Sequence, residues 1–159
     1  IMACITDAQS LLKSCGVDQW QDGYPTAEII SGDIERSESY LLTDNGEVIA
    51  TVVISFAGEP TYTTIVGHWL NNNSYAVIHR LAVRAAHRNK GIAKSIFDQA
   101  EQLCLKNGIN DIRVDTHRDN KIMLKLLKQL GYTICGEITL LSGAKRVALQ
   151  KELQDNGRL

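Results

Sequence analysis

The residues with the clearest chemistry form a short basic string that ends in a glycine. Arg88 and Lys90 flank Asn89, and Gly91 follows where an amphipathic helix is predicted to begin. The free backbone N–H groups and the positive dipole end of a helix N-terminus attract anions, and two cations strengthen that attraction. Gly91 and the small Ala93 would let an anion approach the backbone closely. The string predicts a site for a multiply charged anion, although an ordinary strand-to-helix turn with solvated charges would show the same residues.

A strand and a helix must position this turn. Residues 75–83 form a nearly continuous apolar run, interrupted by His79 and Arg80, whose length suits a strand covered on both faces. After the turn, apolar residues recur at helical spacing until Gly108 supplies a left-handed stop. A further apolar strand is predicted at 110–116. The order strand, helix, strand predicts a β-α-β unit with two parallel strands.

Periodicity and turn signals predict the other elements. Helices are expected at 1–15, from Thr26 onward with Ile30 and Ile34 as its apolar face, and at 120–130. Hairpins are expected at 39–56, around the turn Asp44-Asn45-Gly46, and at 132–151. Between them, 57–74 is interpreted as an inserted flap whose residues 62–70 could form one short helix.

Length and composition predict a single domain over residues 1–153, with a frayed tail at 154–159. The net charge of -1 leaves no basic face of the kind that nucleic acid requires, so nucleic acid is not expected as a partner. No apolar run has membrane-spanning length and no secretory signal is visible. A protein of the cytoplasm that does not bind membranes is therefore expected.

The four cysteines do not suggest a metal site or a disulfide framework. No two of them form a C-x-x-C pair, and no histidine lies near them at ligand spacing. They are Cys4, Cys15, Cys104 and Cys135. We expect ordinary thiols and no bound metal.

Two motifs give the chain a family resemblance. The string from Arg88 to Ala93 matches the R/Q-x-x-G-x-G/A signature of the GCN5-related N-acetyltransferases (GNAT), and Leu81-Ala82-Val83 stands where that family has its pyrophosphate-proximal strand. Downstream, Asn120-Lys121-Ile122-Met123 and then Leu130-Gly131-Tyr132 are similar to the family's N-x-x-A and x-G-F/Y segments, at the usual distance. Two motifs in the right spacing are far more specific than one. The resemblance covers the second half of the chain strongly and the first half in outline.

The resemblance implies an α/β fold with a mixed, mostly antiparallel central sheet, a splayed parallel pair of strands and flanking helices. The family opens with a short strand before its first helix, whereas helical periodicity here begins at Ile1. The first strand is therefore expected to be missing. The sheet edge beside it would be exposed, which makes a homodimer possible.

The resemblance also implies acetyl-CoA as the cofactor. The family places the pantetheine arm of coenzyme A between the splayed strands, where it pairs with backbone like an added strand, and the diphosphate at the basic string. The residues implied to bind it are Leu81, Ala82, Val83, Arg88, Asn89, Lys90, Gly91, Ile92, Ala93, Ser95 and Asn120. The alternative for Asn120 is that it caps its own helix and does not contact the cofactor.

Acetyl transfer to an amine requires a base, donors for an oxyanion and an acid for the leaving thiolate. His79 is the first candidate base, because it lies two residues before Leu81, on the same predicted face, and an imidazole titrates near neutrality. Glu59, acting through a water, is the second candidate, and a purely structural histidine is the alternative. Leu127 stands where many family members have a tyrosine acid, so Tyr132 or a water must serve, or the thiolate leaves unaided.

Four aromatic residues in loops are predicted to line the acceptor site. They are Trp20, Tyr24, Tyr62 and Trp69, which could close over a small molecule or could merely cover the core edge. Arg80 is expected on the opposite face from His79, where it needs a carboxylate partner, and Asp115 is the candidate.

The resemblance thus implies an acetyl-CoA-dependent N-acetyltransferase that acts by direct transfer on a primary amine of a small molecule, an amino acid or a peptide. The alternative from a different class is a non-catalytic acetyl-CoA-binding sensor or regulatory module.

Overall fold

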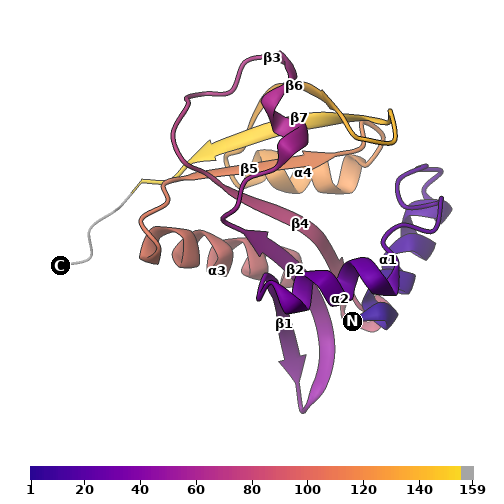
Figure 1. The fold of residues 1–159 in the computed structure, drawn as a ribbon. Coiled ribbons are helices and arrows are strands. Elements are labelled where there is room, and N and C mark those ends of the chain that lie inside the picture. The colour runs from indigo at the N-terminus through magenta and orange to yellow at the C-terminus, as the bar shows by residue number, and fades with distance from the viewer. Residues whose placement is uncertain (155–159) are drawn as a thin grey trace.

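The computed structural model describes residues 1–154, so most of the predicted tail, residues 155–159, lies outside the described residues. A seven-stranded sheet runs through the molecule in the order β1-β2-β4-β5-β7-β6-β3 (Figure 1). The elements in chain order are α1 (Met2–Ser14), α2 (Ala27–Glu35), β1 (Ser39–Asp44), β2 (Glu47–Ser55), η1 (Pro60–Thr63), β3 (Ile65–Gly67), β4 (Ala76–Val83), η2 (Ala85–His87), α3 (Ile92–Lys106), β5 (Asp111–Thr116), α4 (Lys121–Gln129), β6 (Thr133–Thr139) and β7 (Lys145–Glu152).

The sheet is mixed and mostly antiparallel, as predicted. Among the strands of residues 1–154, only β4 and β5 run parallel, with α3 as the crossover between them. β2 pairs with β4, and β7 with β5, in the antiparallel sense on the outer sides of this pair. β1 forms one edge of the sheet and β3 forms the other.

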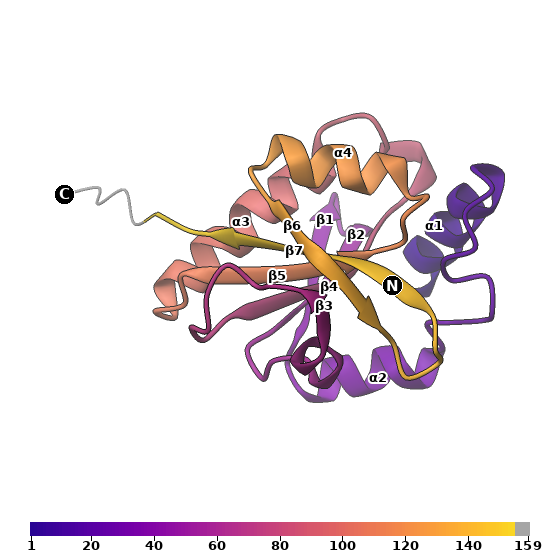
Figure 2. The same ribbon diagram turned by 90° about the horizontal axis from the view of Figure 1, so that it is seen from above.

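Helices cover both faces of the sheet (Figure 2). On one face, α3 and α4 pack against β2, β4 and β5, around Phe97, Ile112 and Leu127, which are almost inaccessible to solvent. On the other face, α1 and α2 bury Ile5 and Ile30 against Ala82 of β4. Because β4 is covered on both sides, its apolar run is nearly continuous.

Helix α2 shows how local signals and tertiary packing combine. Its start follows the capping rule, since the backbone N–H of Ile29 donates a 3.4 Å hydrogen bond to the Thr26 hydroxyl. The predicted apolar face was half right, because Ile30 is buried whereas Ile34 is 52% exposed. Asp33 takes the inward position instead, and is fully buried because it has an arginine partner on β4.

The prediction of one helix over 62–70 was wrong. The chain instead makes the short turn η1 and then β3, which pairs antiparallel with β6 from Ile65↔Ile138 to Gly67↔Gly136. The two glycines allow this pairing, since a Cβ on either one would lie 2.2 Å from a backbone oxygen of the other strand. Non-local pairing therefore overrides the weak helical pattern.

Candidate active site

The parallel strands β4 and β5 separate shortly after they meet. Their ladder has two pairs, Ala76↔Ile112 and Val77↔Arg113, and from there residues 78–83 and 114–116 line the opposite walls of a cavity. The cavity has a volume of about 1770 Å³. In this slot the edges of β4 and β5 that face each other have no strand partner among the described residues. The slot can therefore accept an extended chain that hydrogen-bonds like a strand.

Six successive backbone N–H groups, residues 89–94, form an amide row at one end of the cavity. Among residues 1–154 none of these groups has a hydrogen-bond acceptor, and the first hydrogen bond of α3 is donated by the N–H of Ser95. Gly91 precedes the helix with a φ of 74°, which an amino acid with a side chain rarely adopts, and Asn89 has a φ of 60°. The row and the positive end of the α3 dipole make this turn suitable for an anion.

The loop before the amide row is fastened to α1. The Asp7 carboxylate accepts hydrogen bonds from Arg84 Nε at 2.8 Å and from the Ala85 backbone N–H at 2.9 Å. These donors, the backbone N–H first, lower the pKa of Asp7. The Asp7 carbonyl in turn accepts a hydrogen bond from Arg88. The fastening fixes the turn relative to the wall that α1 adds to the cavity.

Most of the residues expected to bind the cofactor line this cavity. Those that do are Leu81, Ala82, Val83, Arg88, Asn89, Gly91, Ile92, Ala93 and Asn120. Lys90 is not among the lining residues, and Ser95 faces a smaller groove between α3 and the β1–β2 hairpin, where its hydroxyl accepts a hydrogen bond from Gln99. Lys94, which the motif did not single out, lines the main cavity instead.

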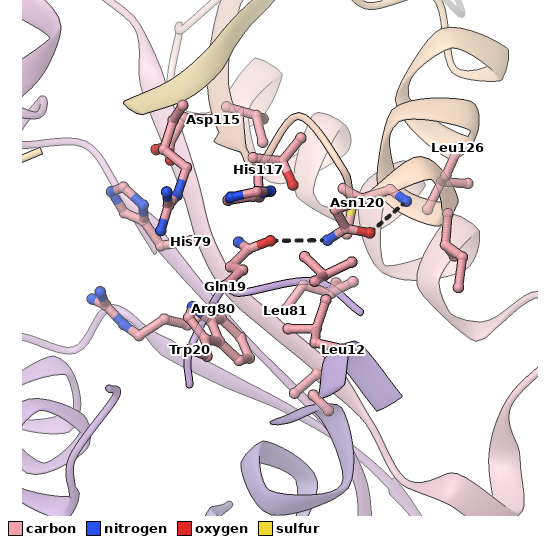
Figure 3. A pocket seen from close by; sticks show the side chains of 18 of the residues that line it. Leu12, Gln19, Trp20, His79, Arg80, Leu81, Asp115, His117, Asn120 and Leu126 are labelled. Atoms are coloured by element: carbon pink, nitrogen blue, oxygen red, sulfur yellow. Dashed lines mark hydrogen bonds between the residues drawn. The ribbon is translucent and has the colours of Figure 1, made fainter. Parts of the chain in front are cut away.

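Asn120 caps its own helix, as considered, and also contacts the loop after α1. Its Oδ1 accepts a 3.1 Å hydrogen bond from the Met123 N–H and so caps α4. Its Nδ2 donates a 3.0 Å hydrogen bond to Gln19 Oε1, from the loop after α1 (Figure 3). Asn120 therefore ties the start of α4 to that loop, at the edge of the cavity.

His79 and Glu59 lie together at the other end of the slot, which we call the acceptor end. Nε2 of His79 is 3.5 Å from Glu59 Oε2, and both residues line the cavity. The other Glu59 oxygen, Oε1, accepts hydrogen bonds from the Thr61 N–H and hydroxyl, which fixes the carboxylate as the cap of η1. His79, and then these Thr61 donors, lower the pKa of Glu59 to about 2 against the opposing effect of burial. The imidazole therefore faces a carboxylate that is ionised at neutral pH.

A β-bulge changes the faces predicted along β4. Arg80 has a φ of 51°, and the register with β2 shifts between the pairs Val53↔His79 and Thr51↔Ala82. Consequently His79 and Arg80 both turn toward the side of η1 and α2, while Leu81 packs on the α3 side (Figure 3). The prediction that His79 shares a face with Leu81 and opposes Arg80 was wrong, because the extra residue of a bulge reverses the alternation.

The partner predicted for Arg80 was also wrong. Its guanidinium donates to Asp33 of α2 through Nε at 2.8 Å and Nη2 at 2.6 Å, and through Nη1 to the Tyr24 hydroxyl. Burial opposes the charge of Arg80, but Tyr24 and Asp33 raise its pKa on balance. Asp115 instead accepts a 2.7 Å hydrogen bond from the Tyr62 hydroxyl. A carboxylate on a helix far away in sequence was not a candidate that strand pairing could suggest.

Two of the four predicted aromatic residues line the cavity. Trp20 and Tyr24 do so, with ring centroids 6.4 Å apart. Tyr62 and Trp69 are not among the lining residues, because their rings pack against each other at a tilt of 41°, and Trp69 Nε1 donates to the Tyr62 carbonyl. Their rings support η1 from behind rather than closing over the slot.

The structure brings neither Leu127 nor Tyr132 to the cavity wall. Leu127 is fully buried in the α3–α4 core, and Tyr132 packs edge-on against Phe97 with its hydroxyl buried. Burial raises the pKa of Tyr132 well above its ordinary value. Within residues 1–154, no group of three or more His, Cys, Asp or Glu is placed to hold a metal ion, and no described helix is long and apolar enough to cross a membrane.

Comparison with known proteins identifies the fold. Residues 5–132 match the family model described as the acetyltransferase (GNAT) family. The chain belongs to the GNAT acetyltransferase family. A GNAT family acetyltransferase from Streptococcus agalactiae 2603 is 32% identical, with a TM-score of 0.84 over 96% of this chain and 88% of that one. No curated protein sequence gives a significant match.

More distant structures share the fold of this GNAT acetyltransferase. One from Listeria monocytogenes 4b F2365, also a GNAT family acetyltransferase, is 24% identical, with a TM-score of 0.71 over 95% of this chain and 86% of that one. The NatC complex bound to Gag peptide and CoA contains a chain 18% identical, with a TM-score of 0.63 over 81% of this chain and 80% of that chain.

The cavity of this GNAT acetyltransferase fits the acetyl-CoA that the family uses. The amide row suits a diphosphate and the unpaired strand edges suit an extended amide-bearing arm. Two buried polar atoms of lining residues, Thr116 Oγ1 and His87 Nδ1, have no hydrogen-bond partner within residues 1–154. No motif marked either residue in advance.

Proposed function

We propose that this GNAT acetyltransferase transfers the acetyl group of acetyl-CoA directly to a primary amine of a small molecule, an amino acid or a peptide. The observation that carries the proposal is one continuous cavity with an anion site, the amide row, at one end and the His79–Glu59 pair at the other. Bound there, acetyl-CoA would supply the activated acetyl thioester. The chain would hold its diphosphate at residues 89–94 and its arm along β4 and β5.

In this proposal His79 removes the proton from the amine. An amine attacks only in its neutral form, so the site must accept a proton near neutral pH, which an imidazole can do. The ionised Glu59, 3.5 Å away, orients the ring and stabilises the imidazolium that forms. Glu59 is thus a positioning residue, itself held in place by Thr61.

Backbone N–H groups supply the donors for the oxyanion. The β4 edge around Leu81 faces the slot without a strand partner and offers N–H donors to an oxygen that gains negative charge. Because Leu127 replaces the tyrosine of many family members and Tyr132 lies outside the cavity, we assign the proton for the leaving thiolate to water in the cavity.

The direct test is thiol release from acetyl-CoA in the presence of a panel of primary amines. The unaltered protein is expected to release thiol in step with acetyl-amine formation, and His79→Gln to lower kcat/KM by roughly 10²- to 10³-fold. Glu59→Gln should lower kcat about tenfold, because the imidazolium loses its counter-ion. Acetyl-CoA binding without transfer to any amine would contradict the proposal and favour a sensor of acetyl-CoA.

A further inference from the structure

Two side chains of opposite charge line the acceptor end of the cavity without a counter-ion. Asp115 of β5 accepts one hydrogen bond, from the neutral Tyr62 hydroxyl, through Oδ1. Arg146 of β7 donates one hydrogen bond, from Nη1 to the Lys145 carbonyl. Within residues 1–154 neither side chain forms an ion pair. Each therefore keeps hydrogen-bonding capacity for something in the cavity.

The sheet register places the two charges beside each other. Asp115 pairs with Ala148, and Arg146 precedes Ala148 by two residues, so both side chains project from the same face of the sheet as diagonal neighbours about 7–8 Å apart. Tyr62 contacts Asp115 on that face, and its ring centroid lies 6.4 Å from that of His79. The candidate base and the two charges therefore border the same end of the cavity.

Nearby basic residues show that Arg146 differs from an ordinary surface cation. Arg118 and Lys145, whose side chains are 65% and 63% exposed, both form ion pairs with Glu137, at 2.9 and 2.8 Å. Arg146 is more covered by the protein and yet has no carboxylate partner in the described chain. A partly buried guanidinium loses hydration that an ion pair would normally replace. Its partner is therefore expected among the ligands of the cavity.

Arg80, the other arginine at this end, is already occupied. Asp33 receives two of its N–H groups and Tyr24 a third, so the buried ion pair neutralises its charge. Arg146 thus has the freer guanidinium, whose planar donors match the two oxygens of a carboxylate.

We propose that the acceptor is an amine that carries a carboxylate close to its nitrogen, as a free α-amino acid does. The carboxylate binds Arg146, and the amine lies between Asp115 and His79. The inference rests on the proposed amine acetylation and specifies the class of acceptor. A simple monoamine has no carboxylate, and at a peptide N-terminus the α-carboxyl group is part of a peptide bond.

The test measures binding before catalysis. Free L-amino acids and the matching L-amino acid amides, which differ only at the carboxyl group, are titrated into the protein by calorimetry. We expect at least one free acid to bind about tenfold or more tightly than its amide. Arg146→Gln should remove this preference by weakening the free acid alone, Arg146→Lys should retain part of it, and Asp115→Asn should weaken both ligands. Arg36→Gln makes the same charge change at an exposed side chain that does not line the cavity and should alter neither affinity.

Equal affinity for acids and amides, binding of neither, or an equal loss for both in Arg146→Gln would overturn the inference. Thermal unfolding of each variant separates a lost contact from a lost fold, and Arg146→Lys, which keeps the charge, provides a second variant. Steady-state kinetics distinguishes the two proposals. A preference for acids without acetyl transfer would refute the amine acetylation but support the carboxylate subsite. Transfer to acids and amides at equal KM would support the amine acetylation but refute the subsite.

Discussion

Glu59 is the residue on which the chemistry of the acceptor end depends. Its pKa of about 2 keeps the carboxylate ionised at any pH at which a neutral amine could react. Its two oxygens have different tasks: one caps η1 through Thr61 and the other faces His79. A single side chain therefore fixes both the start of a turn and the orientation of the candidate base.

This arrangement predicts a pH-dependent stability difference for Glu59→Gln. A carboxylate whose pKa falls from 4.5 to about 2 on folding stabilises the native state above pH 4.5 and loses that contribution as pH falls through about 2. Because Glu59 is a quarter exposed, we expect a contribution of about 1–2 kcal/mol at about pH 5. Gln keeps the oxygen that caps η1, so the difference isolates the charge.

Urea unfolding at several pH values measures this difference. The difference in the free energy of unfolding between the unaltered protein and Glu59→Gln should decrease as pH falls from 4.5 to about 2. A difference that stays constant over this range would mean that the carboxylate is not held in its ionised form by His79.

At the scale of elements, the bulge in β4 decides which side chains reach the acceptor end. It turns His79 and Arg80 to the same side of the sheet, and the buried Asp33 of α2 neutralises Arg80 there. A helix that lies on the sheet thus stabilises an irregular strand. Helix α2 therefore influences the position of His79 indirectly, through the Asp33–Arg80 ion pair.

Asp33→Asn tests this dependence. Removing the charge leaves Arg80, only 13% exposed, without its buried counter-ion, so we expect the free energy of unfolding to fall by about 3 kcal/mol. Arg36→Gln is the matched control, because Arg36 also contacts Asp33 but is 57% exposed, and its loss should cost less than about 1 kcal/mol. If chemical denaturation shows equal losses for both variants, the buried pair does not hold the bulge in place.

At the scale of the whole molecule, the cavity joins the two layers. The turn before α3 is fastened to α1 through Asp7, and the start of α4 is tied to the loop after α1 through Asn120 and Gln19. Gln19 and Asn120 both line the cavity between β4 and β5. The turn that carries the amide row and the start of α4 thereby form one frame with α1 and the loop after it.

Sequence predicted the parts of this frame that depend on local signals. The turn at Gly91, the caps at Thr26 and Asn120 and the parallel pair could all be predicted, because each follows from backbone chemistry or periodicity. The bulge at Arg80 could not be predicted, because no residue type marks it in the sequence. It reverses the faces of the strand only by shifting its register with β2. The unpaired Thr116 hydroxyl could not be predicted either, because only the folded structure shows that it is buried without a partner.

The measurement that tests the central claim most directly is a calorimetric titration of acetyl-CoA into the unaltered protein, Gly91→Ala and Gly91→Glu. Ala imposes the backbone strain of a φ of 74° without adding charge, whereas Glu adds both strain and a negative charge at the amide row. We predict micromolar binding to the unaltered protein, a loss of about tenfold or less in Gly91→Ala and of about 100-fold or more in Gly91→Glu. The absence of binding to the unaltered protein, or equal affinities for the two variants, would contradict the claim that residues 89–94 hold the cofactor's diphosphate.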